Sequence, residues 1–413
     1  MKIVIIGNSA AGLNALETFR KFDQISHITI VTKEKAPAYS RVLLPYYLRK
    51  KIRYDQMFIR DRAYYKKMNV SVIEDRVTQV DFDNQRVVLK KGQPLSYDQL
   101  LIATGSLPVK PIIPGLEGPR IHNLWTLEDV KNIEACFEEG KRVLMLGAAF
   151  VSLQAAWAAV KREQTTSIFV RSHIMRNVLD EAGVNRLKNN MLDQGVTFIT
   201  ETNLKKINRN PDGSIRIEFS NRDALEVDTI IVGAGIKANI DFLEDSNLAI
   251  GTGILVNNQM ETNLPGIYAA GDVAAGLSAF GERHVVRGLW PTAVEQGKIA
   301  GANMAGNKVI YEGSLNMNVT SLFGLTVASM GKFLKNEGEK EIVFINDKEN
   351  YLKLVVEKSI LIGGTAVGMP MLVNSLGLMK PYIQQRKQVD RLTLDNLVKY
   401  QFPPVMMNAH MAS

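Results

Sequence analysis

The chain has 413 residues, 46% of them hydrophobic and 22% charged, with a formal net charge of +8. This composition is typical of an ordinary globular protein, and the length indicates two or three domains. We find the Lys and Arg scattered, without a dense basic run interleaved with aromatic residues, so an acidic protein partner or anionic cofactors fit the charge better than nucleic acid.

The single cysteine, Cys136, excludes several kinds of site. It cannot form an internal disulfide or a CxxC redox pair, and it cannot supply the ligands of a four-cysteine zinc site or an iron-sulfur cluster. We interpret Cys136 as a small buried hydrophobic residue and expect no metal site. No apolar run reaches the ~18 residues of a membrane helix, and a strand begins at Lys2 without a signal peptide, so we expect a cytoplasmic protein with no membrane partner.

The first twelve residues, MKIVIIGNSAAG, are typical of a strand that turns directly into a helix. Gly7 permits the tight bend, and Gly12 allows the helix to pack close to the strand. Ser9 takes a position that is usually glycine, but serine is small and its hydroxyl can donate to a phosphate. The stretch predicts a dinucleotide pyrophosphate site formed by Gly7, Ser9, Ala10, Ala11 and Gly12.

Two charged residues follow the next predicted strand, residues 28–31. Glu34 lies about 20 residues after the first turn, where an acidic side chain holds the ribose hydroxyls of an adenine dinucleotide. Its alternative role is that of one more surface charge in the run KEK. Arg41, in the stretch YSRVLLPYYL, is placed either to contact a pyrophosphate with its guanidinium or to lie on the surface beside a helix start.

Short strands are predicted next, and the last of them runs into the segment ATGSLP. These strands cover residues 70–74, 77–82, 86–89 and 97–103. A stretch rich in proline and glycine then marks a linker, where we expect a domain to end. Its punctuating residues are Pro111, Pro114, Gly115 and Gly118.

A second strand, turn and helix follow at residues 142–162. The three glycine positions of the motif are now Gly147, Ala149 and Ser152, which predicts a second but degraded dinucleotide site. Arg171 follows the next predicted strand, at a position where an NAD site would favour an acid. It either accommodates a 2′-phosphate, as in NADP sites, or is solvated, and the spacing does not decide between the two.

Strands are predicted at residues 196–200, 215–219 and 229–232, and the second unit closes with the stretch GAG. The stretch LPGIYAAGD then predicts a buried strand that ends in Gly271 and Asp272, at the edge of a parallel sheet where ligands bind. We interpret Asp272 as a partner of a ribityl hydroxyl rather than as a helix N-cap. The helix that begins at Trp290 presents a positive end suited to a reduced flavin. Strands at residues 325–330, 341–345, 351–357 and 360–367 predict a third, antiparallel domain, followed by a tail.

Taken together, these stretches resemble the FAD- and NAD(P)-dependent pyridine nucleotide-disulfide oxidoreductase superfamily over nearly the whole chain. They are GNSAAG, PAYSRVLLPYYL, LLIATGSLP, GAAFVS, TIIVGAG, LPGIYAAGD and GLWPTAVEQG. The resemblance implies an α/β fold with two Rossmann-like dinucleotide-binding domains and a small C-terminal α+β domain. The implied parts are a discontinuous FAD-binding domain at 1–112 and 240–310, an inserted NAD(P)-binding domain at 113–239, a C-terminal interface domain at 311–385 and a tail at 386–413.

The resemblance also implies the roles of individual residues. To the FAD site it assigns, besides the first turn, Glu34, Arg41, Thr104, Gly105, Gly271, Asp272, Trp290, Thr292 and Ala293. To the NAD(P) site it assigns Gly147, Ala149, Phe150, Val151, Ser152, Gln154, Arg171, Gly233 and Gly235. Gln154 stands where members of the superfamily usually have a Glu near the nicotinamide, and its amide can hydrogen-bond a carboxamide.

The region after the first turn carries no redox cysteine. In this respect, and in the stretch YSRVLLPYYL, the chain resembles one branch of the superfamily. This branch contains NADH:rubredoxin and ferredoxin reductases, the flavin module of nitrite reductases, and flavin subunits of iron-sulfur, tungsten or carbon monoxide dehydrogenase complexes. This branch implies hydride transfer between NAD(P)H and FAD without a catalytic side chain. It also implies single-electron exchange with an iron-sulfur protein or subunit, in a homo- or hetero-oligomer. Two alternatives remain, an NAD(P)H oxidase that uses O2 and a flavin-carrying structural subunit with a vestigial nicotinamide site.

Overall fold

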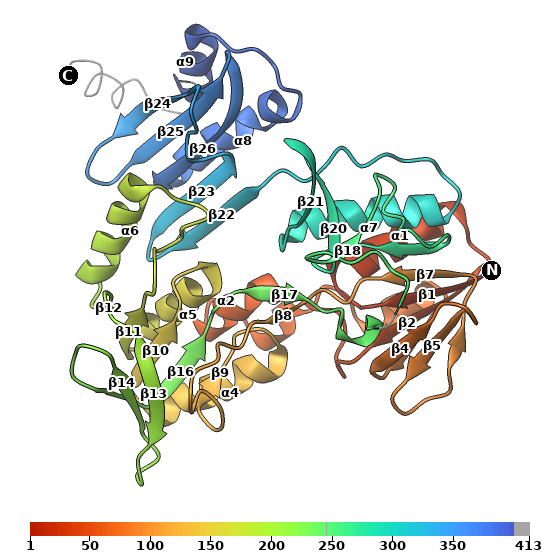
Figure 1. Cartoon of the computed structure of the whole chain (residues 1–413), viewed down its shortest axis with the longest axis horizontal. Coiled ribbons are helices and arrows are strands. Elements are labelled where there is room, and N and C mark those ends of the chain that lie inside the picture. Colours follow the sequence, from red (N-terminus) through yellow and green to blue (C-terminus); the bar gives the residue numbers. More distant parts are fainter. Residues whose placement is uncertain (245, 400–413) are drawn as a thin grey trace. The chain divides into compact units, whose positions relative to one another are not determined.

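The computed structural model describes residues 1–244 and 246–399. Backbone contacts divide the chain into two compact units (Figure 1). The first comprises residues 1–109 and 235–314, and the second comprises residues 110–234 and the described residues from 315 on. The FAD-binding domain was predicted at 1–112 and 240–310, within a few residues of the limits of the first unit. That this unit binds FAD as a separate domain stays a prediction. The later part of the predicted tail, from residue 400, lies outside the described residues.

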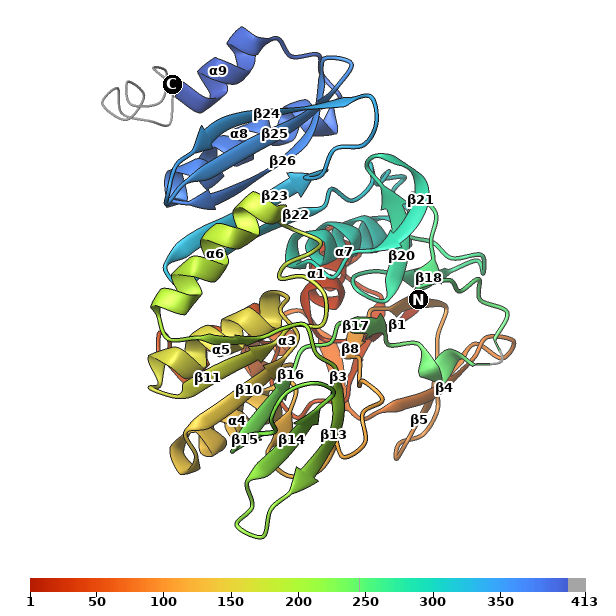
Figure 2. The same cartoon turned by 60° about the vertical axis from the view of Figure 1, so that its left-hand side comes forward.

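The first unit is built on a five-stranded parallel sheet in the order β19-β7-β1-β2-β3. The strands are β1 (Lys2–Ile6), β2 (His27–Thr32), β3 (Val70–Glu74), β7 (Gln99–Ile102) and β19 (Ile267–Ala269). Two helices lie side by side along this sheet, α1 (Ala10–Phe22) and α7 (Trp290–Met304) (Figure 1, Figure 2). A Cβ on Gly297 or Gly301 of α7 would overlap with the backbone of Ala11 or Ala15, so the missing side chains permit this close packing.

Smaller elements complete the first unit. An antiparallel sheet follows β3 and consists of β4 (Val77–Asp81), β5 (Arg86–Leu89) and β6 (Leu95–Ser96). Two further small sheets pair β8 (Ser106–Pro108) with β17 (Ile236–Ala238), and β18 (Ile254–Leu255) with β20 (Ala274–Ser278) and β21 (Gly281–Val286). The short helices are η1 (Arg41–Leu43), α2 (Leu44–Leu48), η2 (Tyr54–Met57), α3 (Arg62–Lys67) and η3 (Asp241–Leu243).

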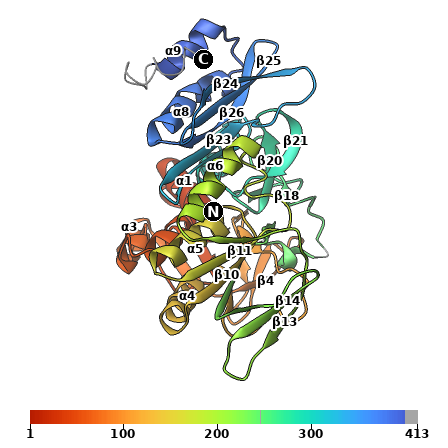
Figure 3. The same ribbon diagram turned by 90° about the vertical axis from the view of Figure 1, so that its left-hand side faces the viewer.

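The second unit contains a parallel sheet of the same design, in the order β12-β11-β10-β16-β9. Its strands are β9 (Ile121–His122), β10 (Arg142–Leu146), β11 (Thr165–Phe169), β12 (Thr197–Ile199) and β16 (Thr229–Val232). The helices α4 (Leu127–Glu139), α5 (Phe150–Lys161) and α6 (Glu181–Asp193) accompany this sheet (Figure 3). An antiparallel sheet follows β12 and consists of β13 (Leu204–Arg209), β14 (Ile215–Phe219) and β15 (Leu225–Val227).

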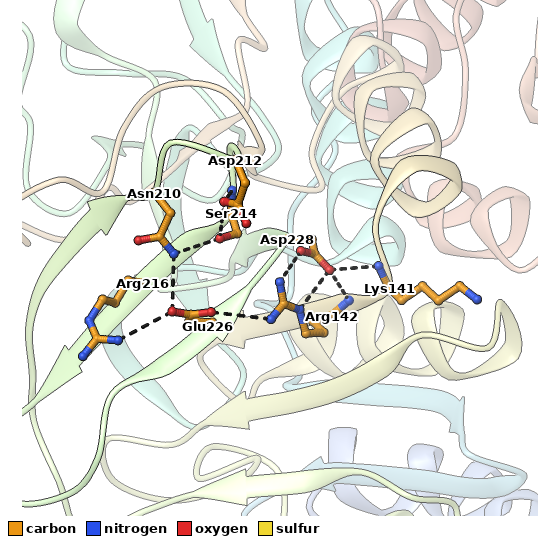
Figure 4. Close-up of polar contacts among 8 residues, drawn as sticks. All are labelled: Lys141, Arg142, Asn210, Asp212, Ser214, Arg216, Glu226 and Asp228. Atoms are coloured by element: carbon orange, nitrogen blue, oxygen red, sulfur yellow. Dashed lines mark hydrogen bonds and ion pairs between the residues drawn. The ribbon is translucent and has the colours of Figure 1, made fainter.

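A carboxylate joins β10 to the strands beside it (Figure 4). Asp228, just before β16, accepts hydrogen bonds from the backbone N–H groups of Lys141 and Arg142 and from the Arg142 guanidinium. The hydrogen bond from the Arg142 guanidinium lowers the pKa of Asp228 most, and the two backbone donors lower it further. Together they bring this pKa to about 2, although burial acts in the opposite direction. Glu226 extends the network to Arg216. This cluster lies at the amino end of β10, away from the edge where parallel sheets bind ligands.

The C-terminal part of the second unit is an antiparallel sheet in the order β22-β23-β26-β25-β24 (Figure 2). Its strands are β22 (Met317–Leu322), β23 (Leu325–Gly331), β24 (Glu339–Asn346), β25 (Tyr351–Glu357) and β26 (Ile360–Gly368), and its helices are α8 (Pro370–Gln384) and α9 (Arg391–Lys399). A buried ion pair ties this sheet to α6, because Lys353 of β25 contacts Asp180, the N-cap of α6. Tyr351 also donates a hydrogen bond to Asp180, at 2.7 Å.

Six predicted strands match the structure at both ends, namely β3, β5, β10, β14, β16 and β25. Helix α6 is not predicted, and neither are two elements of the C-terminal part, the helix α8 and the edge strand β22. Helix α8 carries Gly377 and an internal proline, Pro381, which weaken its helical pattern. Within the described residues, no helix combines the length and apolar character required to cross a bilayer.

Candidate cofactor sites

The turn between β1 and α1 has the geometry expected of a dinucleotide turn. Gly7 has φ of +124°, and its N–H donates to the carbonyl of Val31 in β2 at 2.9 Å. A Cβ at Gly7 would overlap with the carbonyl of Ala103, and one at Gly12 would overlap with the carbonyl of Gly7. Both positions therefore require glycine, because side chains would push the turn away from the sheet and from the helix.

The first turn of α1 offers unpaired donors. Ala10 and Ala11 are buried, and the helix makes its first backbone bond only from Leu13 to the carbonyl of Ser9. The Ser9 side chain makes no capping bond. Among the described residues, the N–H groups of positions 10–12 thus have no acceptor, as at any helix start. An anion fits here, since it satisfies these amides and the positive end of the helix.

Glu34 and Arg41 lie together after β2. Arg41 forms an ion pair with Glu34, and the Tyr39 hydroxyl donates to the other carboxylate oxygen at 2.6 Å. The two residues that sequence analysis assigned to ribose and phosphate thus form one charged pair, with 29% and 23% of their side chains exposed. The pairing orients the carboxylate of Glu34 toward Arg41, and both groups retain hydrogen-bonding capacity for a ligand.

Asp272 follows β19 and is a buried carboxylate. The Ser106 hydroxyl donates to its Oδ2 at 2.7 Å. Burial raises the pKa of Asp272, whereas the Ser106 hydrogen bond and the positive charge of Arg41 act in the opposite direction. Among the described residues it has no ion pair, so hydroxyl donors of a ribityl chain would satisfy its remaining lone pairs.

Gly271 brings the pieces of this site together. Its N–H donates to the side chain of Gln296 in α7 at 2.9 Å. A Cβ at Gly271 would lie 3.1 Å from that of Ala11 and 3.5 Å from that of Ala293, so the first turn and the start of α7 meet at this glycine. Thr104 and Gly105, after β7, are held by hydrogen bonds to Asn239. Trp290 and Thr292 lie in the first turn of α7, beside Ala293.

These residues fit FAD. Unpaired amides at the start of α1 suit a pyrophosphate, the Glu34 carboxylate suits a ribose, and the buried Asp272 suits a ribityl chain. All the predicted FAD residues lie in the first unit and follow the carboxyl ends of β1, β2, β7 and β19 or open α7. Their individual contacts with the cofactor stay predictions.

The turn between β10 and α5 repeats the first turn with side chains added. Gly147 has φ of +108°, and its N–H donates to Phe169 of β11 at 3.0 Å, as Gly7 does to Val31. The Ser152 hydroxyl faces the carbonyl of Gly233 at 3.5 Å. A Cβ at Gly233 would overlap with that hydroxyl, so the glycine after β16 provides the space that Ser152 needs. The altered motif is therefore compensated within the turn.

Gln154 of α5 is engaged within the second unit. Its amide nitrogen donates to Thr320 and to the carbonyl of Ser321 in β22, the latter at 2.9 Å. Its amide oxygen is buried and has no partner among the described residues. The predicted contact of Gln154 with a carboxamide would thus use the oxygen as an acceptor, because the nitrogen already has two partners.

The other predicted NAD(P) residues do not all belong to the same unit. Ala149 caps α5, and Phe150 and Val151 open it. Arg171 is exposed directly beyond β11. Gly233 follows β16 in the second unit, whereas Gly235 belongs to the first, where its carbonyl accepts a hydrogen bond from Val109.

One charged feature was missed by the sequence analysis. Residues 41–67 contain nine Lys or Arg and two Asp, interleaved with aromatic residues, so this stretch accounts for +7 of the total charge of +8 and the basic residues are not evenly scattered. Its first part, residues 41–57, forms an excursion closed at its base, where Tyr39 pairs with Phe58 and the backbone N–H of Ser40 donates to the carbonyl of Met57. A charge count in windows along the chain would have found it.

Cys136 behaves as expected from its surroundings. It is 8% exposed in α4, with its Sγ 3.4 Å from Nε2 of His122. Burial raises the pKa of this thiol. Since the thiolate is the reactive form, Cys136 is a structural residue.

The chain is similar in sequence to several oxidoreductases and electron-transfer subunits, some of its own length and some longer. The NADH-dependent phenylglyoxylate dehydrogenase subunit epsilon of Aromatoleum evansii is 29% identical over 359 residues, 86% of this chain and 85% of the relative. The NADH-rubredoxin oxidoreductase of Clostridium acetobutylicum is 27% identical over 396 residues, 95% of this chain and 97% of the relative. The chain spans 45% of two longer relatives from Bacillus subtilis, an assimilatory nitrate reductase electron transfer subunit and a nitrite reductase.

A solved structure shares the fold over the whole chain. The NAD-dependent persulfide reductase from A. fulgidus has a TM-score of 0.89 and 27% sequence identity, and the match covers 99% of this chain and 83% of that protein. Two parallel sheets of one strand order, each with a glycine turn, define a protein that binds two dinucleotides.

The chain belongs to the pyridine nucleotide-disulphide oxidoreductase family, whose sequence profile matches residues 1–297. The predictions of an α/β fold of this superfamily and of an oxidoreductase are thereby confirmed. FAD as cofactor and a pyridine nucleotide as co-substrate are confirmed with them.

Proposed function

We propose that the protein transfers hydride between NAD(P)H and FAD and exchanges single electrons with an iron-sulfur protein. The observation that carries this proposal is the pair of turns at Gly7 and Gly147, which share one hydrogen-bond pattern and follow the central strands of equivalent sheets. A relative named NADH-rubredoxin oxidoreductase, matched over nearly its full length, supports an iron-sulfur partner.

The residues of this chain serve to bind FAD and to orient it. The amides of residues 10–12 would hold a pyrophosphate, Glu34 a ribose and Asp272 the ribityl chain, and the positive end of α7 would favour a reduced, anionic flavin. When bound, FAD supplies the chemistry that accepts two electrons together and releases them one at a time. No side chain is required to serve as acid, base or nucleophile.

The acceptor of the electrons must lie outside this chain. The sequence contains one cysteine, and Cys136 is buried with a raised pKa, so neither a thiol relay nor a four-cysteine cluster can be formed from this chain. A relative named as a dehydrogenase subunit supports a role as the flavin subunit of a larger redox complex. A homo- or hetero-oligomer in the cytoplasm, without nucleic acid or a membrane as partner, completes the proposal.

An anaerobic titration of the purified yellow protein tests the proposal. NADH or NADPH should bleach the flavin absorbance, and the reduced protein should then reduce an added rubredoxin or ferredoxin faster than it reduces O2. Bleaching followed by fast turnover with O2 alone would support the oxidase instead. Bleaching by dithionite but by neither nucleotide would indicate the structural subunit with a vestigial nicotinamide site.

A further inference from the structure

We propose that the second dinucleotide site selects a nicotinamide dinucleotide that carries a 2′-phosphate, with Arg171 and Ser172 as the selecting residues. The inference rests on the proposed function, in that it takes the turn at Gly147 as a pyridine-nucleotide site. It goes further by naming NADPH as the preferred co-substrate. This differs from the NADH named in several relatives, such as the NADH-rubredoxin oxidoreductase.

The first unit shows which position after the second strand of such a sheet carries the ribose-binding acid, and the second unit can be compared with it. Gly7 donates to Val31 at the end of β2, and Gly147 donates to Phe169 at the end of β11. These bonds place Val31 and Phe169 at equivalent points of the two sheets. Three residues further along each chain segment lie Glu34 in the first unit and Ser172 in the second. The acid that a ribose 2′-hydroxyl requires is therefore present at one site and replaced by serine at the other.

The segment that contains Ser172 lies against the second turn. The N–H of Met175, which has φ of +50°, donates to the carbonyl of Ala148 at 2.9 Å. This bond fixes the segment beside the turn at Gly147, and Ile174 and Met175 are buried there. The residues on either side are exposed and polar or basic, namely Arg171, Ser172, His173 and Arg176.

The charges of this segment are unopposed. Residues 170–179 include no acid, and among the described residues neither Arg171 nor Arg176 has a carboxylate partner. The next acid, Asp180, is engaged by Lys353 and Tyr351. In the first unit, by contrast, Glu34 holds Arg41 in an ion pair.

A 2′-phosphate fits this arrangement and a bare ribose does not. An arginine guanidinium binds phosphate oxygens through two parallel hydrogen bonds, and the serine hydroxyl adds a third donor. A carboxylate at the same position would repel the phosphate. A free ribose hydroxyl finds no carboxylate acceptor within the segment, so NADH would lose the interaction that Glu34 provides in the first unit.

The first test measures binding without redox chemistry. Calorimetric titration of the FAD-loaded protein with adenosine 2′,5′-bisphosphate and with 5′-AMP, which differ in the 2′-phosphate alone, should show at least about tenfold tighter binding of the 2′-phosphate compound, the size expected for hydrogen bonds between charged groups. Arg171→Ala should abolish that difference. Arg216→Ala, an exposed arginine of the cluster at the amino end of β10, should change neither affinity.

The second test restores the acid. Ser172→Glu should lower kcat/KM for NADPH at least about tenfold while kcat/KM for NADH stays equal or rises. The affinity for the 2′,5′-bisphosphate should also weaken below about pH 6, where the phosphate gains a proton. Equal affinity for the two adenine nucleotides, or a preference that survives Arg171→Ala, would overturn the inference. Flavin bleaching by NADH alone would overturn it and leave the proposed function intact, whereas failure of both nucleotides to bleach the flavin would reject that function itself.

Discussion

Asp272 is a buried carboxylate whose surroundings suit a ligand better than a protein cation. Its partner is the Ser106 hydroxyl, and burial raises its pKa. A group of this kind is costly to leave without hydrogen bonds, so it strengthens the binding of a ligand that supplies them.

We therefore expect Asp272→Ala to weaken FAD binding by about tenfold to a hundredfold, the range for hydrogen bonds to a charged group. The flavin content after gel filtration, read from the ratio of flavin to protein absorbance, measures this loss. Asp98→Ala, at the edge of the same unit where it binds only Lys2, is the control and should retain its flavin. A fully flavinated Asp272→Ala protein would contradict the assignment.

We expect the contribution of Asp228 to the stability of the protein to depend on pH. Its pKa in the folded protein is lowered to about 2 from the ordinary 3.8, so its contribution is fully present well above pH 4 and is lost as the pH falls toward 2. Asp228→Asn should lower the free energy of unfolding by about 2 kcal/mol at pH 7 and by less than about 0.5 kcal/mol at pH 2.

Urea titrations of the two proteins between pH 2 and pH 7 measure that difference. Asp223→Asn alters an exposed carboxyl nearby and should have little effect at any pH. If the two proteins differ in their free energy of unfolding by the same amount at every pH, Asp228 stabilises the protein through packing and not through its charge.

At the scale of elements, the FAD turn depends on how closely α7 approaches α1. Gly297 lies against the backbone of Ala11, and Gly301 lies against that of Ala15. Because Ala11 belongs to the first turn of α1, the packing of one helix fixes the position of amides on the other.

Gly297→Ala should lower the free energy of unfolding by about 1–3 kcal/mol and weaken FAD binding, because the new methyl group displaces α1. Gly377→Ala, a helical glycine in α8 with nothing within 4 Å of its Cβ, should instead stabilise the protein slightly through helix propensity. Thermal unfolding and flavin affinity of both variants measure the effects. Equal behaviour of the two alanine variants would mean that the close helix contact is not required.

At the scale of the whole molecule, the charge is concentrated in the stretch 41–67. Lys50 and Lys51 are exposed within the closed excursion and have no ion pair among the described residues. A concentrated basic surface attracts an acidic protein over distances of about a Debye length, and this attraction weakens as salt is added.

Lys50→Glu combined with Lys51→Glu should therefore slow the reduction of an acidic iron-sulfur protein about tenfold or more at low salt, since steering changes association rates by that order. Flavin reduction by the nucleotide should stay unchanged. Lys90→Glu with Lys91→Glu, an exposed pair after β5, is the matched control. Stopped-flow rates at several salt concentrations measure the effect, and equal slowing by both pairs would assign it to net charge alone.

Much of the fold follows from local patterns. The strands β3, β5, β10 and β16 were predicted to the residue, because runs of apolar residues bounded by glycine or polar residues encode them locally. Helix α8 was missed because its proline and glycine contradict the local pattern, and its packing against β23 and β26 overrides that pattern.

The sequence by itself determined the family, the two glycine turns and the kinds of residue at each cofactor site, since these depend on spacing within a few dozen residues. Only the tertiary structure decided which of those residues meet. It paired Glu34 with Arg41, placed Ser152 against Gly233, and bound the Met175 segment to the second turn. Such contacts join strands and loops that the sheets bring together, and single-sequence spacing carries no information about them.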